Sequence, residues 1–408
     1  MKTQVAAIEF GTSKIVTVIA QSSDRNSHCD IISCGKVDYA GYGSGDWNDW
    51  EHLSDAVYNS IIAAQSESKS YIKEIYIGVP CEFIHVKTTE ANVSINNENG
   101  RVTAADVHAV EDMAARLFNF KENADMVIHR SPAWYSVNNG RRTMEPIGMR
   151  GERLSARISF ITVAAEFVDD MRTIMGRAGI TINGFLSPSL GEQLSTTKEA
   201  DRDQRCMYVD CGMYNTEVSV LNGDAMTYHA VLPCGGNDIT ARLADEFNIR
   251  YDTAEQLKRS VCLGENEDTL LNPPVCYDNN GRRVRFDAEE VCQVVRSALD
   301  DVCLMIKRTD EDAEEELVPR SKVYLTGGGL ALLRGGTEYL EKYLGRKVEE
   351  AITVSKKLGS PEYTSVLGLV DLIFDSIEQR FGEQETLPVR VFDTLKGLFD
   401  RSRDDEEE

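Results

Sequence analysis

A short turn that occurs twice, about two hundred residues apart, constrains this chain more than any other feature. In each copy an apolar run ends in a carboxylate, one residue follows, and a glycine then opens a polar loop before the next apolar run. The first copy is Glu9-Phe10-Gly11 in "QVAAIEFGTSKIVTVIA", and the second is Asp210-Cys211-Gly212 in "CMYVDCGMYNTEVSV". Two β-rich runs around such a loop predict a hairpin. A repeat at about half the chain length indicates a duplicated domain rather than a solenoid.

The composition of these turns suggests what they bind. A tight glycine turn exposes backbone N–H groups, which form a concave site for anions such as phosphates. Two facing turns could hold one polyphosphate, and Mg²⁺ would then be needed between the phosphates and the two carboxylates. We therefore expect Glu9 and Asp210 to hold hydrated Mg²⁺. The alternative is that both are ordinary hairpins in which the acid and the glycine serve only turn geometry.

Three further segments fit a nucleotide cleft between two halves of the chain. "LTGGG" (325–329) and "PCGGND" (233–238) each lead into a predicted helix, where backbone N–H groups can meet a phosphate or a sugar edge. "AEQLKR" (254–259) supplies a glutamate and a lysine suited to ribose hydroxyls. A triple glycine alone is a weak signal, so the prediction depends on the combination.

The order of predicted elements is α/β throughout, with hairpins feeding helices, and this favours a mixed sheet. Thr103 can cap a helix over 103–117 together with Asp106 at its third position. The charged stretch "KEADRDQR" (198–205) is interpreted as a linker between the halves, and "DEDAEEE" (310–316) as a solvated acidic loop.

Length and charge exclude several classes of protein. At 408 residues the chain is too long for one ordinary core, so two domains or one domain with insertions are expected. A net charge of −23 without a basic stripe argues against nucleic acid as a partner. The ten cysteines contain no C-x-x-C pair and the six histidines are scattered, so we expect reduced core cysteines and no zinc site. The N-terminus has no signal-peptide pattern and no run could span a membrane, which predicts a cytoplasmic protein.

The motifs together resemble a known superfamily. The order of "IEFGTSK", "VDCGMYNTEVSV", "LPCGGNDITARLADEF", "AEQLK", "VYLTGGGLALLRG" and "YTSVLGLVDL" is similar to that of the actin-like ATPases. "VNNGRRTMEPIGMRGERLSARISFITV" (137–163) and an amphipathic C-terminus narrow the resemblance to the FtsA family of bacterial cell-division proteins, over roughly residues 4 to 400. The resemblance implies an α/β actin-like ATPase fold, with two duplicated RNase H-like domains around a nucleotide cleft and an FtsA-type inserted subdomain.

The resemblance also implies a division of the chain. The parts it implies are a first core (1–83 and 164–200, joined by 360–380), an inserted subdomain (84–163), a second core (201–240 and 318–359), an upper subdomain that receives FtsZ (241–317), and a linker with a membrane-targeting helix and an acidic end (381–408).

Carried onto this sequence, the resemblance implies an ATP site with Mg²⁺. The residues that it assigns to the first phosphate loop, the second phosphate loop, the ribose-adenine side and the last nucleotide loop are, in that order, Gly11, Thr12, Ser13 and Lys14; Gly212, Met213, Tyr214, Asn215 and Thr216; Gly236, Asp238, Glu255 and Lys258; and Gly327, Gly328 and Gly329.

Departures from the family pattern bear on catalysis. Glu9 stands where the family usually has aspartate, and Met213, Tyr214 and Asn215 are bulkier than the usual loop residues. Because hydrolysis needs an aligned water as well as bound phosphate, we expect ATP binding with weak or absent ATPase activity. Gln193 or Glu192 is a candidate to orient that water, and the alternative is that both are surface polar residues.

The tail and the upper subdomain carry the partners that the resemblance implies. In "VRVFDTLKGLFDRSR" (389–403) one helical face can lie in a bilayer interface, although "DDEEE" (404–408) opposes anionic lipid and a packed terminal helix is the alternative. Arg285 and Arg296 would receive the acidic tail of FtsZ, unless they belong to a solvated face. The apolar residues of the membrane face are Val391, Phe392, Leu395, Leu398 and Phe399.

The implied function is an ATP-binding protein that polymerises on the cytoplasmic face of the inner membrane and tethers FtsZ filaments there at the division site, together with other division proteins. One alternative is an ATP-dependent small-molecule kinase of the same fold, but no catalytic base facing the γ-phosphate is evident. Another is an actin-like pilus-assembly protein, which would lack the amphipathic tail.

Overall fold

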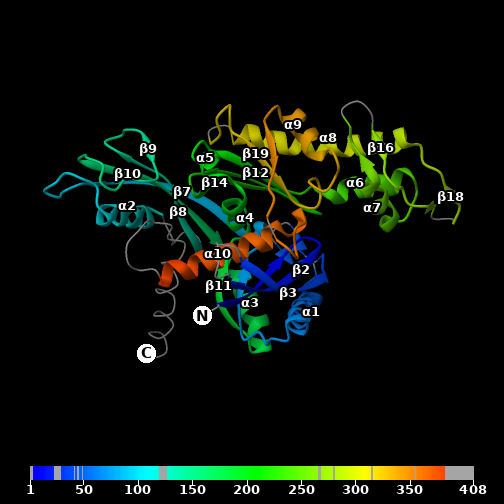
Figure 1. Ribbon diagram of the computed structural model, residues 1–408, viewed down its shortest axis with the longest axis horizontal. Coiled ribbons are helices and arrows are strands. Elements are labelled where there is room, and N and C mark those ends of the chain that lie inside the picture. Colours follow the sequence, from blue (N-terminus) through cyan, green and yellow to red (C-terminus); the bar gives the residue numbers. More distant parts are fainter. Residues whose placement is uncertain are drawn as a thin grey trace.

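Two five-stranded sheets with the same strand order form the two halves of the protein (Figure 1). The computed structural model describes residues 3–22, 29–40, 42–43, 46–47, 49–118, 126–264, 268–278, 281–313, 316–353 and 355–381. The first sheet has the order β11-β6-β1-β2-β3 and the second the order β14-β13-β12-β19-β20. The strands of the first sheet are β1 (Gln4–Phe10), β2 (Lys14–Ser22), β3 (Cys29–Asp38), β6 (Glu74–Gly78) and β11 (Thr181–Leu186). Those of the second are β12 (Cys206–Cys211), β13 (Thr216–Asn222), β14 (Ala225–Leu232), β19 (Val323–Thr326) and β20 (Val348–Glu350).

Strand directions repeat as well. In each sheet the first three strands in sequence are antiparallel neighbours, and the first of them is parallel to the next strand along the sheet, β6 or β19. Both sheets are therefore mixed, as predicted. The two glycine turns close in the same way: Gly11 N–H donates to the carbonyl oxygen of Lys14 over 2.8 Å, and Gly212 N–H to that of Asn215 over 2.9 Å. The predicted hairpins and the predicted duplication are confirmed.

Helices cover the first sheet on both faces. Helix α1 (Trp50–Ser68) and helix α3 (Ala165–Ala178) pack on one face through side chains such as Leu53 and Phe167. The opposite face is covered by α10 (Thr364–Phe381), whose Val366 and Val370 contact the first strands of the chain. The C-terminal helix thus returns to the N-terminal sheet. Figure 1 shows this return as the orange-red helix above the blue strands.

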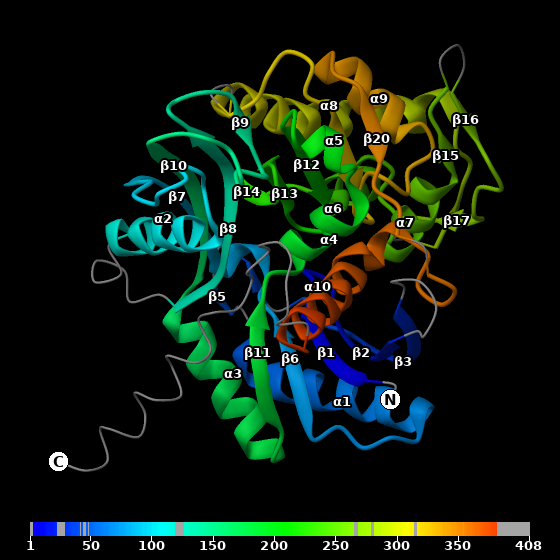
Figure 2. The same cartoon turned by 60° about the vertical axis from the view of Figure 1, so that its left-hand side comes forward.

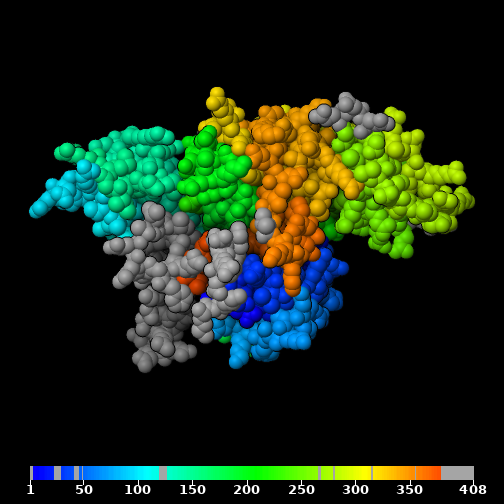
Figure 3. Space-filling model, in the orientation of Figure 1, coloured from blue at the N-terminus to red at the C-terminus, as the bar shows by residue number. Residues whose placement is uncertain are grey.

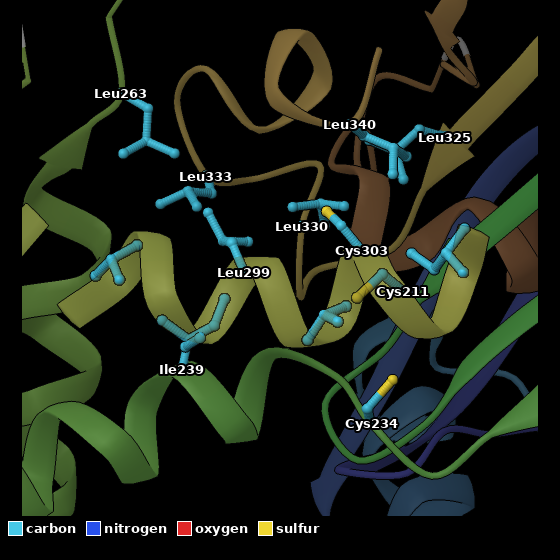
Figure 4. Close-up of a cluster of buried hydrophobic side chains, with 14 of the residues drawn as sticks. Cys211, Cys234, Ile239, Leu263, Leu299, Cys303, Leu325, Leu330, Leu333 and Leu340 are labelled. Carbon is cyan, nitrogen blue, oxygen red and sulfur yellow. The ribbon is translucent and has the colours of Figure 1, made fainter. Parts of the chain in front are cut away.

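The second sheet has its own apolar core. Helix α8 (Ala288–Asp312) crosses beside α6 (Gly236–Glu246), and Leu299 and Cys303 of α8 meet Ile239 of α6 together with leucines that follow β19 (Figure 4). Burying a side chain of this size stabilises the fold by roughly 1.5–3 kcal/mol. The two halves contain four further described α-helices: α4 (Pro188–Thr196), α5 (Glu199–Arg202), α7 (Tyr251–Ser260) and α9 (Gly336–Leu344).

An inserted subdomain follows β6. It consists of a four-stranded antiparallel sheet, β7-β10-β8-β9, with α2 (Ala104–Leu117) on one face. Thr103 and Asp106 form the predicted capping box at the start of α2, with the Thr103 N–H donating to the Asp106 carboxylate over 2.8 Å. Figure 2 shows this subdomain beside β13 and β14 of the second half. Its strands are β7 (Ile84–Ser94), β8 (Met126–Val137), β9 (Arg142–Thr143) and β10 (Arg153–Val163).

Several short elements complete the described structure. Two-residue strands form three small ladders, and two short 3₁₀ helices precede β7 and α10. These elements are β4 (Tyr42–Gly43), β5 (Asp46–Trp47), β15 (Val261–Cys262), β16 (Thr269–Leu270), β17 (Cys276–Tyr277), β18 (Arg283–Val284), η1 (Cys81–Phe83) and η2 (Pro361–Tyr363).

The prediction of a solvated loop at 310–316 is wrong. Helix α8 continues through Asp312, and Asp310 lies 2.9 Å from the guanidinium of Arg346. Glu316 forms a two-bond pair with Arg157 of the inserted subdomain, at 2.6 and 2.9 Å. The prediction failed because the partners of these acidic residues, Arg346 and Arg157, are distant in the sequence.

The stretch 198–205, predicted as a linker, does join the halves, but it contains the short helix α5. Arg202 donates to the carbonyl oxygen of Thr197 over 2.9 Å and pairs with Asp224 at 3.0 Å. Asp201 accepts from the Tyr324 hydroxyl over 2.7 Å. Arg202 and Asp201, which would be solvated in a flexible linker, therefore bind this segment to the second half of the protein.

Candidate functional site

The two glycine turns line one cleft between the halves of the protein, with a volume of about 240 Å³. Fifteen of the residues predicted for a nucleotide site line it, although they come from positions 9 to 329 of the chain. These residues are Glu9, Gly11, Thr12, Ser13, Lys14, Asp210, Gly212, Met213, Asn215, Gly236, Glu255, Lys258, Gly327, Gly328 and Gly329. Four others do not line the cleft: Gln193, Tyr214, Thr216 and Asp238.

Three of these four side chains, those of Asp238, Thr216 and Tyr214, are directed to other contacts or to solvent, and that of Gln193 is buried. The Asp238 carboxylate accepts from Gly235 N–H over 2.7 Å and caps α6. Thr216 donates its hydroxyl to the carbonyl oxygen of Cys234 over 2.8 Å. Tyr214 has an exposed side chain, and its backbone N–H lies 3.3 Å from the Thr12 hydroxyl oxygen, which joins the two turns directly.

Glycines let three loops meet at the floor of the cleft. Gly329 N–H donates to the carbonyl oxygen of Cys211 over 2.7 Å, and Gly236 N–H to that of Gly212 over 3.0 Å. A Cβ on Gly329 would lie only 2.3 Å from the Gly212 oxygen. Gly327 has φ +89°, in the region that favours glycine, and a Cβ there would lie 2.2 Å from a carboxylate oxygen of Asp210. The glycines serve this close approach of backbones, which a single sequence motif does not reveal.

Glu9 and Asp210, which both line the cleft, have unusual acidities. Burial raises the pKa of Glu9 to about 7, while the charge of Lys14 and a 3.3 Å hydrogen bond from Ser365 act in the opposite direction. Burial also raises the pKa of Asp210 to about 7, and the charges of Glu217 and Glu9 add to the rise. In the described residues no group of three or more metal-ligating side chains could hold a bare ion. Two carboxylates suit a hydrated Mg²⁺ that also takes phosphate oxygens.

These acidities predict a pH dependence of stability. With folded pKa values near 7 and unfolded values near 4, the folded state binds more protons, so its stability falls as pH rises from about 4 to about 7. The double variant Glu9→Gln/Asp210→Asn removes this loss. In nucleotide-free thermal melts we expect it to be more stable than the parent at pH 8, by several kcal/mol, and much closer to it at pH 5.

The control for this experiment is Glu51→Gln/Asp55→Asn, which makes the same charge change on the exposed side of α1. Its effect should be small and similar at both pH values. Equal effects of Glu9→Gln/Asp210→Asn at pH 5 and pH 8 would contradict the assignment.

Lys14, predicted to meet phosphate, already holds an acidic partner. Its ammonium lies 2.8 Å from a carboxylate oxygen of Glu362 and 4.1 Å from the centre of the Tyr363 ring. Burial acts to raise the pKa of Glu362, but the hydrogen bond and charge of Lys14 outweigh it, so the pKa lies below its ordinary value. Glu362 is therefore an anion in the cleft, and sequence reasoning missed it because it lies nearly 350 residues from Lys14.

An ionised Glu362 should compete with a phosphate for Lys14. We expect Glu362→Gln to bind Mg-ATP about five- to tenfold more tightly in titration calorimetry, since it frees the lysine and removes a repelling charge. Glu199→Gln, an exposed change of the same type, should leave the affinity unaltered. Weaker binding by Glu362→Gln would show instead that the pair holds Lys14 in its working position.

The opposite end of the cleft is held by Lys258 and Glu255. The Lys258 ammonium donates to the carbonyl oxygen of Gly236 over 3.0 Å and to the Thr240 hydroxyl over 2.9 Å, and it lies 2.7 Å from Glu255. Glu255 also pairs with Arg259 at 2.8 Å. This network ties α6 to α7, so these groups fix the start of α6 beside the cleft.

The structure places Glu192 and Gln193 in the interior of the protein and outside the lining of the cleft. The surface alternative is wrong, because the two side chains are 1% and 0% exposed. Gln193 is also not among the residues that line the cleft. Ser189 of the same helix does line the cleft, and so does Glu217, which accepts from Ser189 over 2.7 Å and lies 3.1 Å from His229. Its signal in the sequence was a single acid in the apolar run "TEVSVLN".

Family models and curated relatives both point to the FtsA family. A family model described as "Cell division protein FtsA" matches residues 207–368, and one described as "SHS2 domain inserted in FTSA" matches residues 83–162. The curated FtsA of Borreliella burgdorferi is 23% identical over 405 residues, covering 95% of this chain and 94% of that protein. The FtsA of Neisseria meningitidis serogroup B is 22% identical over 377 residues, covering 90% and 89%.

Solved structures show the same fold. The "PilM-PilN type IV pilus biogenesis complex" has a TM-score of 0.60 at 17% identity, covering 90% of this chain and 98% of that one. MreB 5 of Spiroplasma citri bound to AMPPNP has a TM-score of 0.53 at 12% identity, covering 93% and 98%. At such low sequence identities the structural similarity establishes the actin-like fold only, and the function has to be inferred from the residues of the site.

Proposed function

Because the chain belongs to the FtsA family of actin-like cell-division proteins, we propose that it binds Mg-ATP in this cleft, polymerises on the inner membrane and tethers FtsZ filaments there. The observation that carries the proposal is the meeting of both glycine turns, Lys14, the buried Glu9 and the half-buried Asp210 in one cleft. The turns and Lys14 would hold the phosphates, and Glu9 and Asp210 would hold hydrated Mg²⁺. Glu255 and Lys258 would face the ribose. The AMPPNP bound by the MreB 5 of the same fold supports a nucleotide here.

We propose that turnover is slow. Gln193, the predicted water-orienting residue, does not line the cleft, so a water beside the phosphate would lack that positioning group, and hydrolysis depends on an aligned water. Glu217 does line the cleft; one of its carboxylate oxygens accepts from Ser189, and the other lies 3.1 Å from His229. Bound ATP would act chiefly as a structural ligand that fixes the two halves for assembly.

Negative-stain microscopy on lipid monolayers tests the proposed function. We expect ordered filaments of the full chain with Mg-ATP, and sparse or no filaments when the nucleotide is omitted. Added FtsZ should co-align with the filaments. Bare monolayers in both states, under conditions in which the protein binds ATP, would contradict assembly on the membrane.

The proposed FtsZ surface lies in the upper subdomain, at the end of the molecule opposite the inserted subdomain (Figure 3). Arg285 is exposed there and directly follows β18, which pairs with β17; the exposed Tyr277 lies in β17, and the exposed Val275 directly precedes that strand. Arg296 differs, because its guanidinium makes two 2.6 Å bonds to Asp268. The acidic tail peptide that the family suggests would therefore find its cation at Arg285, with apolar contacts beside it.

Charge reversal at Arg285 tests whether this residue binds the FtsZ tail. We expect Arg285→Glu to weaken binding of an FtsZ C-terminal peptide at least fivefold in fluorescence anisotropy. Arg308→Glu makes the same charge change at an exposed position on α8 and should alter binding less than twofold. Arg296→Glu is a poor test, since it would also break the bond to Asp268. Equal peptide affinity for the parent and Arg285→Glu would place the FtsZ tail elsewhere.

Membrane attachment is proposed from the sequence. Val391, Phe392, Leu395, Leu398 and Phe399 lie outside the described residues. Among the helices that are described, none is long and apolar enough to cross a bilayer. An amphipathic segment lying in the interface would supply attachment without a spanning helix.

A further inference from the structure

A second cavity lies on the sheet of the inserted subdomain, away from the nucleotide cleft. It has a volume of about 290 Å³ and opens on the sheet face opposite α2. Its walls come from all four strands and the turn between β8 and β9. We call it the β-face pocket; the residues that line it are Glu90, Ala91, Asn92, Trp134, Ser136, Asn139, Gly140, Arg142, Arg153, Ser155 and Ala156.

The strand register explains the chemistry of this pocket. Side chains alternate across a strand, so the pairs Asn92–Ser155, Ser155–Ser136 and Ser136–Arg142 bring four polar side chains into one row on one face. The apolar positions between them face α2 instead. Part of the same polar face is already covered, since Trp134 packs against Ala225 of the second half. The pocket is the part of this face that no described element covers.

Cations dominate the pocket in a strongly acidic protein. The Arg142 guanidinium lies 4.5 Å from the centre of the Trp134 ring, and Arg153 is exposed. Residues 141–157 contain five arginines and two glutamates, whereas the whole chain has a net charge of −23. Of these arginines, Arg157 is paired with Glu316. Glu90 of β7 is the acidic residue among those that line the pocket, so the side of the pocket formed by β7 is less favourable for an anion.

The rest of the pocket wall is polar and small. Two arginines stand beside the hydroxyl side chains of Ser136 and Ser155, and the Trp134 ring beside Arg142 is only 8% exposed. Such a wall favours a ligand with several acceptor oxygens. Carboxylates meet guanidinium groups with two parallel bonds.

We propose that the β-face pocket binds a carboxylate-rich peptide, and that its occupant is the acidic end of this chain, residues 404–408. That end is "DDEEE", five consecutive carboxylates, which complements the arginines of the pocket. Helix α10 runs toward the side of the molecule that carries the inserted subdomain (Figure 1, Figure 2), and 27 residues follow Phe381. Extended, a segment of that length spans up to about 90 Å, enough to reach the pocket.

Covalent connection makes this docking effective even if the isolated contact is weak. A tethered segment acts at an effective concentration set by its linker, in the millimolar range for short flexible links. Docking of the acidic end would also hold the preceding segment, residues 389–403, close to the inserted subdomain. The inference concerns a site separate from the nucleotide cleft and does not depend on ATP binding or on membrane attachment.

A labelled peptide of residues 400–408 tests the proposal by fluorescence anisotropy. The protein ending at Arg403 should bind it, and the full chain should bind it at least fivefold more weakly, because its own end competes for the pocket. In the shortened protein, Arg142→Ala/Arg153→Ala should weaken binding at least fivefold, and Arg142→Lys/Arg153→Lys should weaken it less. The control Arg172→Ala/Arg177→Ala removes two exposed charges from α3 and should change binding less than twofold. The same peptide with Asn and Gln in place of the five acidic residues at 404–408 should not bind.

Three results would overturn the proposal. The first is absence of peptide binding to the shortened protein at low salt. The second is equal affinity of the shortened protein and the full chain, which would mean that the end does not occupy the pocket. The third is an equal loss for the α3 control, which would reduce the effect to net charge. Thermal melts of each variant check that the fold is retained.

Discussion

Gly329→Ala is expected to weaken nucleotide binding at least about thirtyfold, whereas Gly328→Ala, one residue earlier, leaves it intact. The added methyl group at Gly329 would lie 2.3 Å from the carbonyl oxygen of Gly212 and 2.8 Å from the backbone nitrogen of Gly236. Both neighbours are backbone atoms of loops held by hydrogen bonds, so neither can turn aside as a side chain would. The three loops must separate instead, and overpacking of this kind typically costs 1–3 kcal/mol.

Gly328 provides a matched control within the same motif. A Cβ there would lie 3.4 Å from Glu362 and 3.7 Å from Leu332, which are ordinary contacts with side-chain atoms. Titration calorimetry with Mg-ATP should show a loss of at least about thirtyfold for Gly329→Ala, the equivalent of about 2 kcal/mol, and less than twofold for Gly328→Ala. Equal affinities for the two variants would mean that the junction of the three loops is not part of the nucleotide site. Melting curves distinguish loss of binding from loss of folding.

Deletion of residues 389–403 is expected to release the protein from membranes almost completely. That segment carries five apolar side chains on one helical face and four basic residues. Burial of such side chains in the interface contributes on the order of several kcal/mol in total, and removal therefore reduces partitioning by a factor of a hundred or more. In sedimentation with anionic liposomes, the bound fraction should fall from most of the protein to background.

Two companion variants make the membrane experiment specific. Leu395→Asp/Phe399→Asp keeps the length of the tail but disrupts its apolar face, and it should release the protein as the deletion does. Removal of residues 404–408 takes away five negative charges next to the basic segment, so binding to anionic lipid should be unchanged or stronger. Liposome binding by the deletion variant at the parental level would refute this anchor.

Local chemistry predicted much of what the structure contains. The apolar runs around Glu9 and Asp210 specified two hairpins, because β-rich runs and glycine turns act over a few residues. The capping box of Thr103 and Asp106 follows from a spacing of three residues, and it is present. The errors have the opposite origin. Glu316 was predicted to be solvated because its partner, Arg157, is 159 residues away, and Glu362 was overlooked for the same reason.

By itself, the sequence determined the duplicated strand–turn–strand units, the mixed α/β order and the residue types that face the cleft, since all of these depend on neighbours along the chain. Only the tertiary structure decided that Lys14 pairs with Glu362, that Gln193 is buried away from the cleft while Glu217 lines it, and that the polar face of the inserted sheet remains partly open. The physical reason is that burial and charge pairing depend on which surfaces meet when the halves and the insert pack together. No short stretch of sequence contains that information.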